Sequence, residues 1–161
     1  MNDLYETDVV AWSERQAELL RRVAAGEAIN DQVDWPNIID EVETVGRSER
    51  SALGSYIAVV LENLIKLQAS PATDPRKGWK TSVRRARIGI ARGLKDSPSL
   101  RPAVSEMITD EMPSARMIVM SILEEYGEQP AVAIDSLTFT PEQVPGDWFP
   151  EPGDRGAHPA T

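Results

Sequence analysis

Apolar side chains recur three and four residues apart along four long segments of this chain. This spacing places them on one face of a helix and predicts amphipathic helices. No segment alternates apolar and polar residues over the length that a half-buried strand requires. The pattern therefore predicts an all-α protein, with helices over about residues 3–25, 35–70, 76–95 and 100–126.

Single residues set the expected ends and bends of these helices. Gly26 and Gly127 follow the first and last segments and are typical of the position after a helix C-terminus. Asp34 can cap the second helix, in which we expect at most a bend near Gly46. Pro113 lies inside the last segment and should kink it, because its ring removes a donor and crowds the preceding turn.

The chain changes character after Gly127. Six of its twelve prolines fall between residues 130 and 159, and Thr140 can open one short helical turn. Trp148 and Phe149 stand among these prolines and have two interpretations. They either fix the tail onto the bundle by burying large rings, or anchor a partner chain. We expect residues 153–161 to be disordered.

Together these features predict an antiparallel helical bundle of about four long helices with a Pro-rich C-terminal tail. A chain of 161 residues usually forms one folded core. We divide it into a bundle domain at residues 1–127 and a partly packed tail at residues 128–161. The apolar stripe of the second helix is long enough to leave some surface for self-association, as in a homodimer.

Several polar residues interrupt the apolar stripes at 100° per residue. Gln16 falls within the first stripe, Glu49 within the second and Glu111 within the fourth. Arg87 lies on the flank of the third stripe, with Arg84 nearby. A carboxylate inside a helical core is costly unless it is paired. We therefore expect an interior polar cluster of Gln16, Glu49, Arg84, Arg87 and Glu111.

This cluster has three interpretations. A buried ion pair would fix the register of the helices without any further role. A binding or catalytic site would use the same side chains within a cavity. In the third case the helical phases are wrong, and one or more of these residues faces water.

Composition removes several chemistries. The chain has no cysteine and one histidine, His158, in the tail, which excludes thiolate, Cys–His and di-iron helical-bundle sites. There is no Gly-rich phosphate loop, and we expect no cofactor and no specific metal site. A Mg²⁺ site made only of carboxylates stays conceivable. There is no secretion signal and no apolar run long enough to span a membrane, so we expect a cytoplasmic protein.

The charge is uneven along the chain. Residues 74–101 hold nine basic and two acidic side chains, a net charge of +7, while the whole chain carries −9. Such an acidic protein is not expected to bind nucleic acid generally, because that function needs a dominant positive surface. The basic segment either neutralises acidic neighbours in the same bundle or forms a groove for an anionic ligand along Lys80, Arg84 and Arg87.

Several blocks match one known family in order and spacing. They are Trp12-x-x-x-Gln16, the run Ile39 to Arg50, Leu61 to Lys66, Trp79 to Arg87, and Asp96 to Arg101. Across about residues 5–126 the chain resembles the bacterial family called domain of unknown function 29. The resemblance implies an all-helical fold and no established activity. The family often has histidine where this chain has Asn63, and tends to continue its last helix where this chain has Pro113.

The sequence does not identify the biochemical function, and it leaves two main classes of function open. The first is an interaction or assembly protein that uses a bundle face or the Trp148 and Phe149 tail. The alternative is a small-molecule or divalent-metal-dependent enzyme with an interior carboxylate and arginine site at Glu49, Glu111 and Arg87. A weaker third hypothesis is the anionic-ligand groove.

Overall fold

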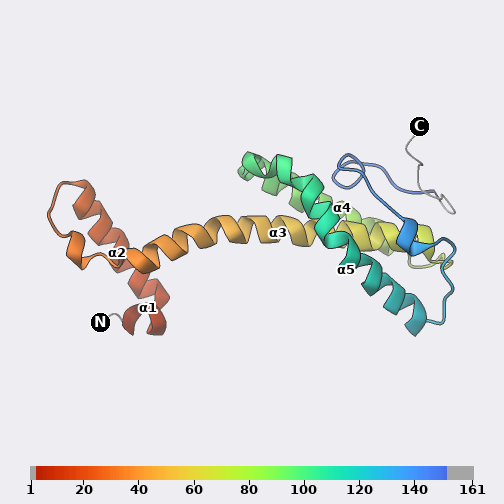
Figure 1. Cartoon of the computed structure of the whole chain (residues 1–161), viewed down its shortest axis with the longest axis horizontal. Coiled ribbons are helices and arrows are strands. Elements are labelled where there is room, and N and C mark those ends of the chain that lie inside the picture. Colours follow the sequence, from red (N-terminus) through yellow and green to blue (C-terminus); the bar gives the residue numbers. More distant parts are fainter. Residues whose placement is uncertain (1–2, 152–161) are drawn as a thin grey trace. The chain divides into compact units, whose positions relative to one another are not determined.

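A computed structural model describes residues 3–151 of the chain, which are helical wherever they are regular (Figure 1). The chain forms two compact units, one up to Ser48 and one from Glu49 onward. The long helix α3, Trp35–Ala69, contributes residues to both units. The all-α prediction is confirmed. The expected disorder at residues 153–161, and His158 within it, lie outside the described residues.

The first unit contains α1, Asp3–Thr7, and α2, Val9–Ala24, followed by the 3₁₀ turn η1, Asn30–Gln32, and the start of α3. The single helix expected over residues 3–25 is wrong at Asp8, which separates α1 from α2. The Asp8 carboxylate accepts a hydrogen bond from the Ala11 backbone N–H at 3.0 Å and so caps α2. Trp12, Leu19 and Val33 are the buried apolar side chains of this unit.

The second unit is built on the remainder of α3 together with α4, Arg76–Asp96, and α5, Val104–Glu125. A 3₁₀ segment, η2, Pro98–Ala103, joins α4 to α5. The helix α4 runs antiparallel to α3, because Gly93 lies against Leu53 while the Arg76 guanidinium donates to the Leu67 carbonyl oxygen at 2.7 Å.

The helix α5 returns parallel to α3. Near its start, Glu106 forms an ion pair with Arg50 at 3.1 Å, and beyond its end Glu128 accepts a hydrogen bond from the Ser70 hydroxyl at 2.7 Å. The three helices bury one continuous apolar cluster, centred on α3 residues such as Ile57, Leu61, Leu64 and Ile65. This core stabilises the unit through burial of apolar surface.

The segment after α5 packs on the same core. Ile134, in the 3₁₀ turn η3, Ile134–Ser136, is buried, as are Leu137, Phe139 and Val144. A turn forms at Thr140, whose hydroxyl accepts a hydrogen bond from the Gln143 backbone N–H at 3.2 Å, as the sequence suggested. The packed tail is therefore part of the second unit. The proposed domain boundary at residue 127 stays a prediction.

The expected ends of two helices are also found. Gly26 and Gly127 both adopt positive φ, at 92° and 65°, directly beyond α2 and α5. An L residue with a side chain rarely takes this conformation, so glycine suits both positions. The helix α3 passes through Gly46 and α5 passes through Pro113, and the bends expected there stay predictions.

Candidate functional site

Arg87 is the buried cation of the second unit, and it is bound by the tail. Its side chain is 7% exposed. The guanidinium donates from Nε to the Val144 carbonyl oxygen at 3.0 Å, and from Nη2 to the carbonyl oxygens of Gln143 and Trp148 at 2.8 Å and 2.6 Å. Burial lowers the pKa of Arg87, and the nearby Asp147 carboxylate acts in the opposite direction. Arg87 therefore ties α4 to the tail backbone.

The aromatic residues of the tail complete this attachment. The Phe149 ring lies beneath the side chains of Lys80, Arg84 and Arg87, whose charged groups are 5.5, 5.3 and 4.8 Å from its centroid. Trp148 packs against Phe139, with ring centroids 6.2 Å apart. Both tail aromatics contact the bundle's apolar core. These contacts agree with the interpretation in which Trp148 and Phe149 fix the tail onto the bundle, and the anchoring of a partner by the same residues stays a prediction.

Gln16 has a corresponding role in the first unit. It is 4% exposed, and its side-chain oxygen accepts a hydrogen bond from the Asp34 backbone N–H at 2.9 Å. The Asp34 carboxylate accepts a hydrogen bond from the Trp12 indole at 3.0 Å. These contacts join α2 to the start of α3. Gln16 was correctly expected to be interior, and its observed partner is backbone.

The expected meeting of the carboxylates with arginine is not observed. Glu49 and Arg84 are exposed, so the prediction that they are interior is wrong. Glu111 is half-buried, with its Oε1 3.4 Å from the place a Cβ would take at Gly54. Among residues 3–151, no ion pair joins either glutamate to Arg84 or Arg87. Because Glu49 is exposed, Glu49, Glu111 and Arg87 do not form the interior site expected for an enzyme.

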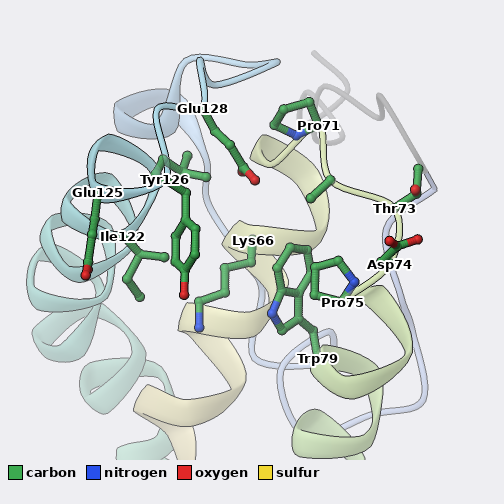
Figure 2. A pocket seen from close by; sticks show the side chains of 12 residues that line it. Lys66, Pro71, Thr73, Asp74, Pro75, Trp79, Ile122, Glu125, Tyr126 and Glu128 are labelled. Carbon is green, nitrogen blue, oxygen red and sulfur yellow. The ribbon is translucent and has the colours of Figure 1, made fainter.

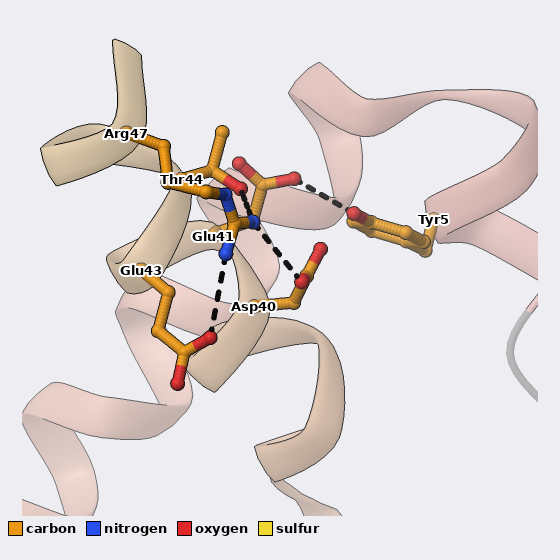
Figure 3. A network of polar contacts seen from close by, with 6 residues as sticks. All are labelled: Tyr5, Asp40, Glu41, Glu43, Thr44 and Arg47. Carbon is orange, nitrogen blue, oxygen red and sulfur yellow. Dashed lines mark hydrogen bonds and ion pairs between the residues drawn. The ribbon is translucent and has the colours of Figure 1, made fainter. Parts of the chain in front are cut away.

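A separate polar network lies on the first unit (Figure 3). Arg47 forms ion pairs with Asp40 and Glu43, both at 3.4 Å, on an exposed face of α3. The Tyr5 hydroxyl donates to the Glu41 carboxylate at 2.7 Å. This hydrogen bond, followed by partial desolvation and the negative charge of Glu41, raises the pKa of Tyr5 from 10.0 to about 12. The network links α1 to α3.

The outward face of α4 is strongly basic. Five exposed cations share an arc of about 100° on this helix, counted at 100° per residue. Ile88, 62% exposed, lies among them. Within the described residues none of the five takes part in an ion pair, so direct pairing does not neutralise this segment as one interpretation required. The cations of this outward face are Lys77, Arg84, Arg85, Arg92 and Lys95.

The sequence contained a signal for this face that the charge total alone did not use. The acidic residues of the basic segment, Asp74 and Asp96, both lie at its ends. The positions between them on the outward arc hold no carboxylate. Reading the charges at helical spacing would have separated these outward cations from the inward Arg87.

The part of the chain that the structure describes offers neither a metal site nor a membrane-spanning helix. No group of three or more histidine, cysteine or carboxylate side chains is close enough there to hold a metal ion. None of the helices between residues 3 and 151 combines the length and the apolar character that a membrane crossing needs.

Comparison with known families gives one match. Residues 4–149 match the family described as "Domain of unknown function DUF29". The chain belongs to this family. The match covers nearly all of the described residues, which include the resemblance over about residues 5–126 and the tail that Arg87 binds. No curated protein and no solved structure matches the chain. Membership therefore gives a relationship and no activity.

Proposed function

We propose that this protein is an interaction protein that binds an acidic segment of a partner protein on the outward face of α4. The observation that carries the proposal is the arrangement, around Ile88 on one helix face, of five exposed cations that form no ion pair among the described residues. From Lys77 to Lys95 this face extends about 27 Å at the helical rise of 1.5 Å per residue. That length suits a helical segment of a partner. A cytoplasmic location is part of the proposal.

The partner is expected to be a protein for two reasons. First, the chain carries −9 overall, so a long polyanion such as nucleic acid would be repelled by most of its surface. Second, Ile88 offers an apolar contact in the middle of the basic face, which phosphate backbones do not use. An amphipathic partner segment with carboxylates flanking leucine side chains complements both features.

The underside of α4 supports this role. Val83, Ala86 and Ile90 are buried in the core, and Arg87 is held by three carbonyl oxygens of the tail. The outward face is therefore presented by a helix that is fixed on its opposite side. A fixed surface loses little conformational freedom when it binds, which favours affinity.

The test uses three probes on the full chain. They are a fluorescein-labelled helical peptide with a leucine stripe flanked by glutamates, a labelled single-stranded oligonucleotide of equal charge, and vesicles of phosphatidylserine and phosphatidylcholine. We expect peptide binding, measured by fluorescence anisotropy, that weakens as salt increases. The oligonucleotide and the vesicles, the latter measured by co-sedimentation, should bind at least tenfold more weakly.

Variants locate the binding. The triple variant Arg84→Glu, Arg85→Glu, Arg92→Glu should weaken peptide binding at least tenfold, and Ile88→Ser should weaken it several-fold. The matched control, Arg15→Glu, Arg21→Glu, Arg101→Glu, makes the same change of charge away from this face and should bind nearly as wild type. An equal loss in both triple variants would contradict the proposal, and so would tighter binding of either other probe. Circular dichroism checks that each variant is folded.

A further inference from the structure

A cavity of about 760 Å³ opens on the second unit, where α3 ends, α4 begins and α5 ends. Figure 2 shows the side chains that line it. This volume falls within the range of small-molecule sites, roughly 300–1,000 Å³. The site is separate from the outward face of α4, so the inference does not depend on the proposed function.

The walls of the cavity are held in place by hydrogen bonds around its edge. The Ser70 hydroxyl donates to Glu128 at 2.7 Å and accepts from the Ala72 backbone N–H at 3.1 Å. The Ala131 backbone N–H donates to the Ala69 carbonyl oxygen at 2.7 Å, which fixes the chain after α5 to the end of α3. The cavity is therefore preformed, as a ligand site usually is.

The interior combines aromatic surface with one cation. The Lys66 side chain extends between Trp79 and Tyr126, as Figure 2 shows, and its ammonium group has no ion-pair partner among the described residues. Tyr126 is 74% exposed, although its ring lines the cavity. An exposed aromatic ring that faces a lysine across a cavity offers an apolar surface and an anion-binding group side by side.

Carboxylates line the same cavity. Asp74, Glu125 and Glu128 come from the loop before α4, the end of α5 and the segment after it. Figure 2 shows the Glu128 carboxylate extending over the cavity toward Lys66, whereas those of Asp74 and Glu125 lie on opposite sides and point away from it. A purely anionic ligand would be repelled by Glu128, and a purely cationic ligand would be repelled by Lys66. A ligand that carries both charges avoids either repulsion, and an apolar body would lie against Trp79 and Tyr126.

We propose that this cavity binds a zwitterionic small molecule, namely a free amino acid with a large apolar side chain. The ligand carboxylate is assigned to Lys66, its ammonium group to the carboxylate of Glu128, and its side chain to the space between Trp79 and Tyr126. Charge-assisted hydrogen bonds at both ends would fix its orientation.

Three probes test the assignment of charge on the full chain by isothermal titration calorimetry. They are L-phenylalanine, phenylalanine amide, which lacks the carboxylate, and N-acetyl-phenylalanine, which lacks the ammonium group. We expect L-phenylalanine to bind at least tenfold more tightly than either derivative. Tighter or equal binding of the amide or of the acetyl compound would overturn the zwitterion assignment, and absence of binding by all three would overturn the site.

Matched pairs of variants test the location. Lys66→Met and Glu128→Gln should each weaken L-phenylalanine binding at least tenfold. Arg101→Met and Glu124→Gln likewise remove one cation and one carboxylate, on residues outside the cavity, and should leave it unchanged. Tyr126→Ala, at an exposed position that should not disturb folding, should also weaken binding. Binding that survives all three cavity variants would overturn the proposal. Loss of acidic-peptide binding with L-phenylalanine binding intact would instead contradict only the proposed function.

Discussion

Each of the two units of this protein buries a polar side chain of a helix that binds another segment, but the cores around these two side chains differ greatly in size. In the first unit Gln16 is buried beside Trp12, Leu19 and Val33. In the second unit Arg87 is buried at the edge of a cluster that extends over three helices and the tail. Both side chains bind backbone groups of non-helical segments. The comparison indicates that such residues join segments here, rather than build a shared polar site.

The difference in core size should set how each unit responds to change. A small core supplies little apolar burial, so the few hydrogen bonds around Asp34 form a large share of what holds the first unit. The second unit has ample apolar burial, and its polar contacts decide instead whether the tail stays attached. The following substitutions test this contrast, from the largest expected effect to the smallest.

Replacing Arg87 by methionine should have the largest effect. The change removes the charged donor that three carbonyl oxygens share, and one of these belongs to Val144, which is fully buried. We expect a loss of about 3 kcal/mol in the free energy of unfolding. Urea denaturation measures the loss, and hydrogen exchange should show it first in the tail. Arg84→Met is the matched control on the same helix, because Arg84 is exposed and lies over the Phe149 ring, a contact worth about 1 kcal/mol or less. Equal losses in the two variants would contradict the assigned role of Arg87.

Gly89→Ala tests how closely α3 and α4 approach. A Cβ at this position would lie 2.6 Å from ring atoms of Tyr56, so the ring has to move away from α4. We expect a loss of about 1–2 kcal/mol from the disturbed packing. In a Tyr56→Ala background the same change should instead stabilise the protein by about 1 kcal/mol, because alanine is the better helix former. A double-mutant cycle measures this reversal of sign, and additive effects would disprove the contact.

Gln16→Leu should act on the first unit alone. It removes the acceptor for the Asp34 backbone N–H while keeping an apolar side chain of similar size, and we expect a local cost of about 1 kcal/mol. Hydrogen exchange should increase within residues 3–48 and stay unchanged in the second unit. The control is Gln32→Leu at an exposed position of η1, which should alter neither unit. A loss of protection throughout the chain would contradict the independence of the two units.

Much of the fold could be predicted from the sequence because helices have a short and regular period. The helix α4, expected over residues 76–95, follows from apolar spacing. The helix ends before Gly26 and Gly127 follow from the conformations open to glycine. The break at Asp8 was missed, because the apolar residues keep their spacing on both sides of it. Apolar spacing records which face could be buried, and local capping decides where a helix ends.

The candidate site was harder to predict, for a physical reason. Gln16 and Arg87 were correctly identified as interior from their helical phase. Their partners are backbone groups, which every residue has, so no pattern of side chains could identify Asp34 or Val144. Glu49 shows the other limit. It shares a stripe with apolar residues such as Val42 and Val45, and these are themselves 69% and 65% exposed. A stripe therefore does not establish that another element covers it.

The smallest effect concerns the surface of the first unit, where stability should depend on alkaline pH. The pKa of Tyr5 is about 12 in the folded chain against an ordinary 10.0, chiefly because its hydroxyl donates to Glu41. The folded state therefore favours the neutral phenol. This contribution is fully present below pH 10 and is lost as the pH rises through about 12. NMR titration of the Tyr5 ring measures the shift directly.

Glu41→Gln should return the pKa of Tyr5 toward 10.0. Glu43→Gln should leave it unchanged, because Glu43 pairs with Arg47. An unshifted Tyr5 would mean that α1 is not held to α3 by this hydrogen bond, and the first unit would then rest on Trp12, Gln16 and Asp34.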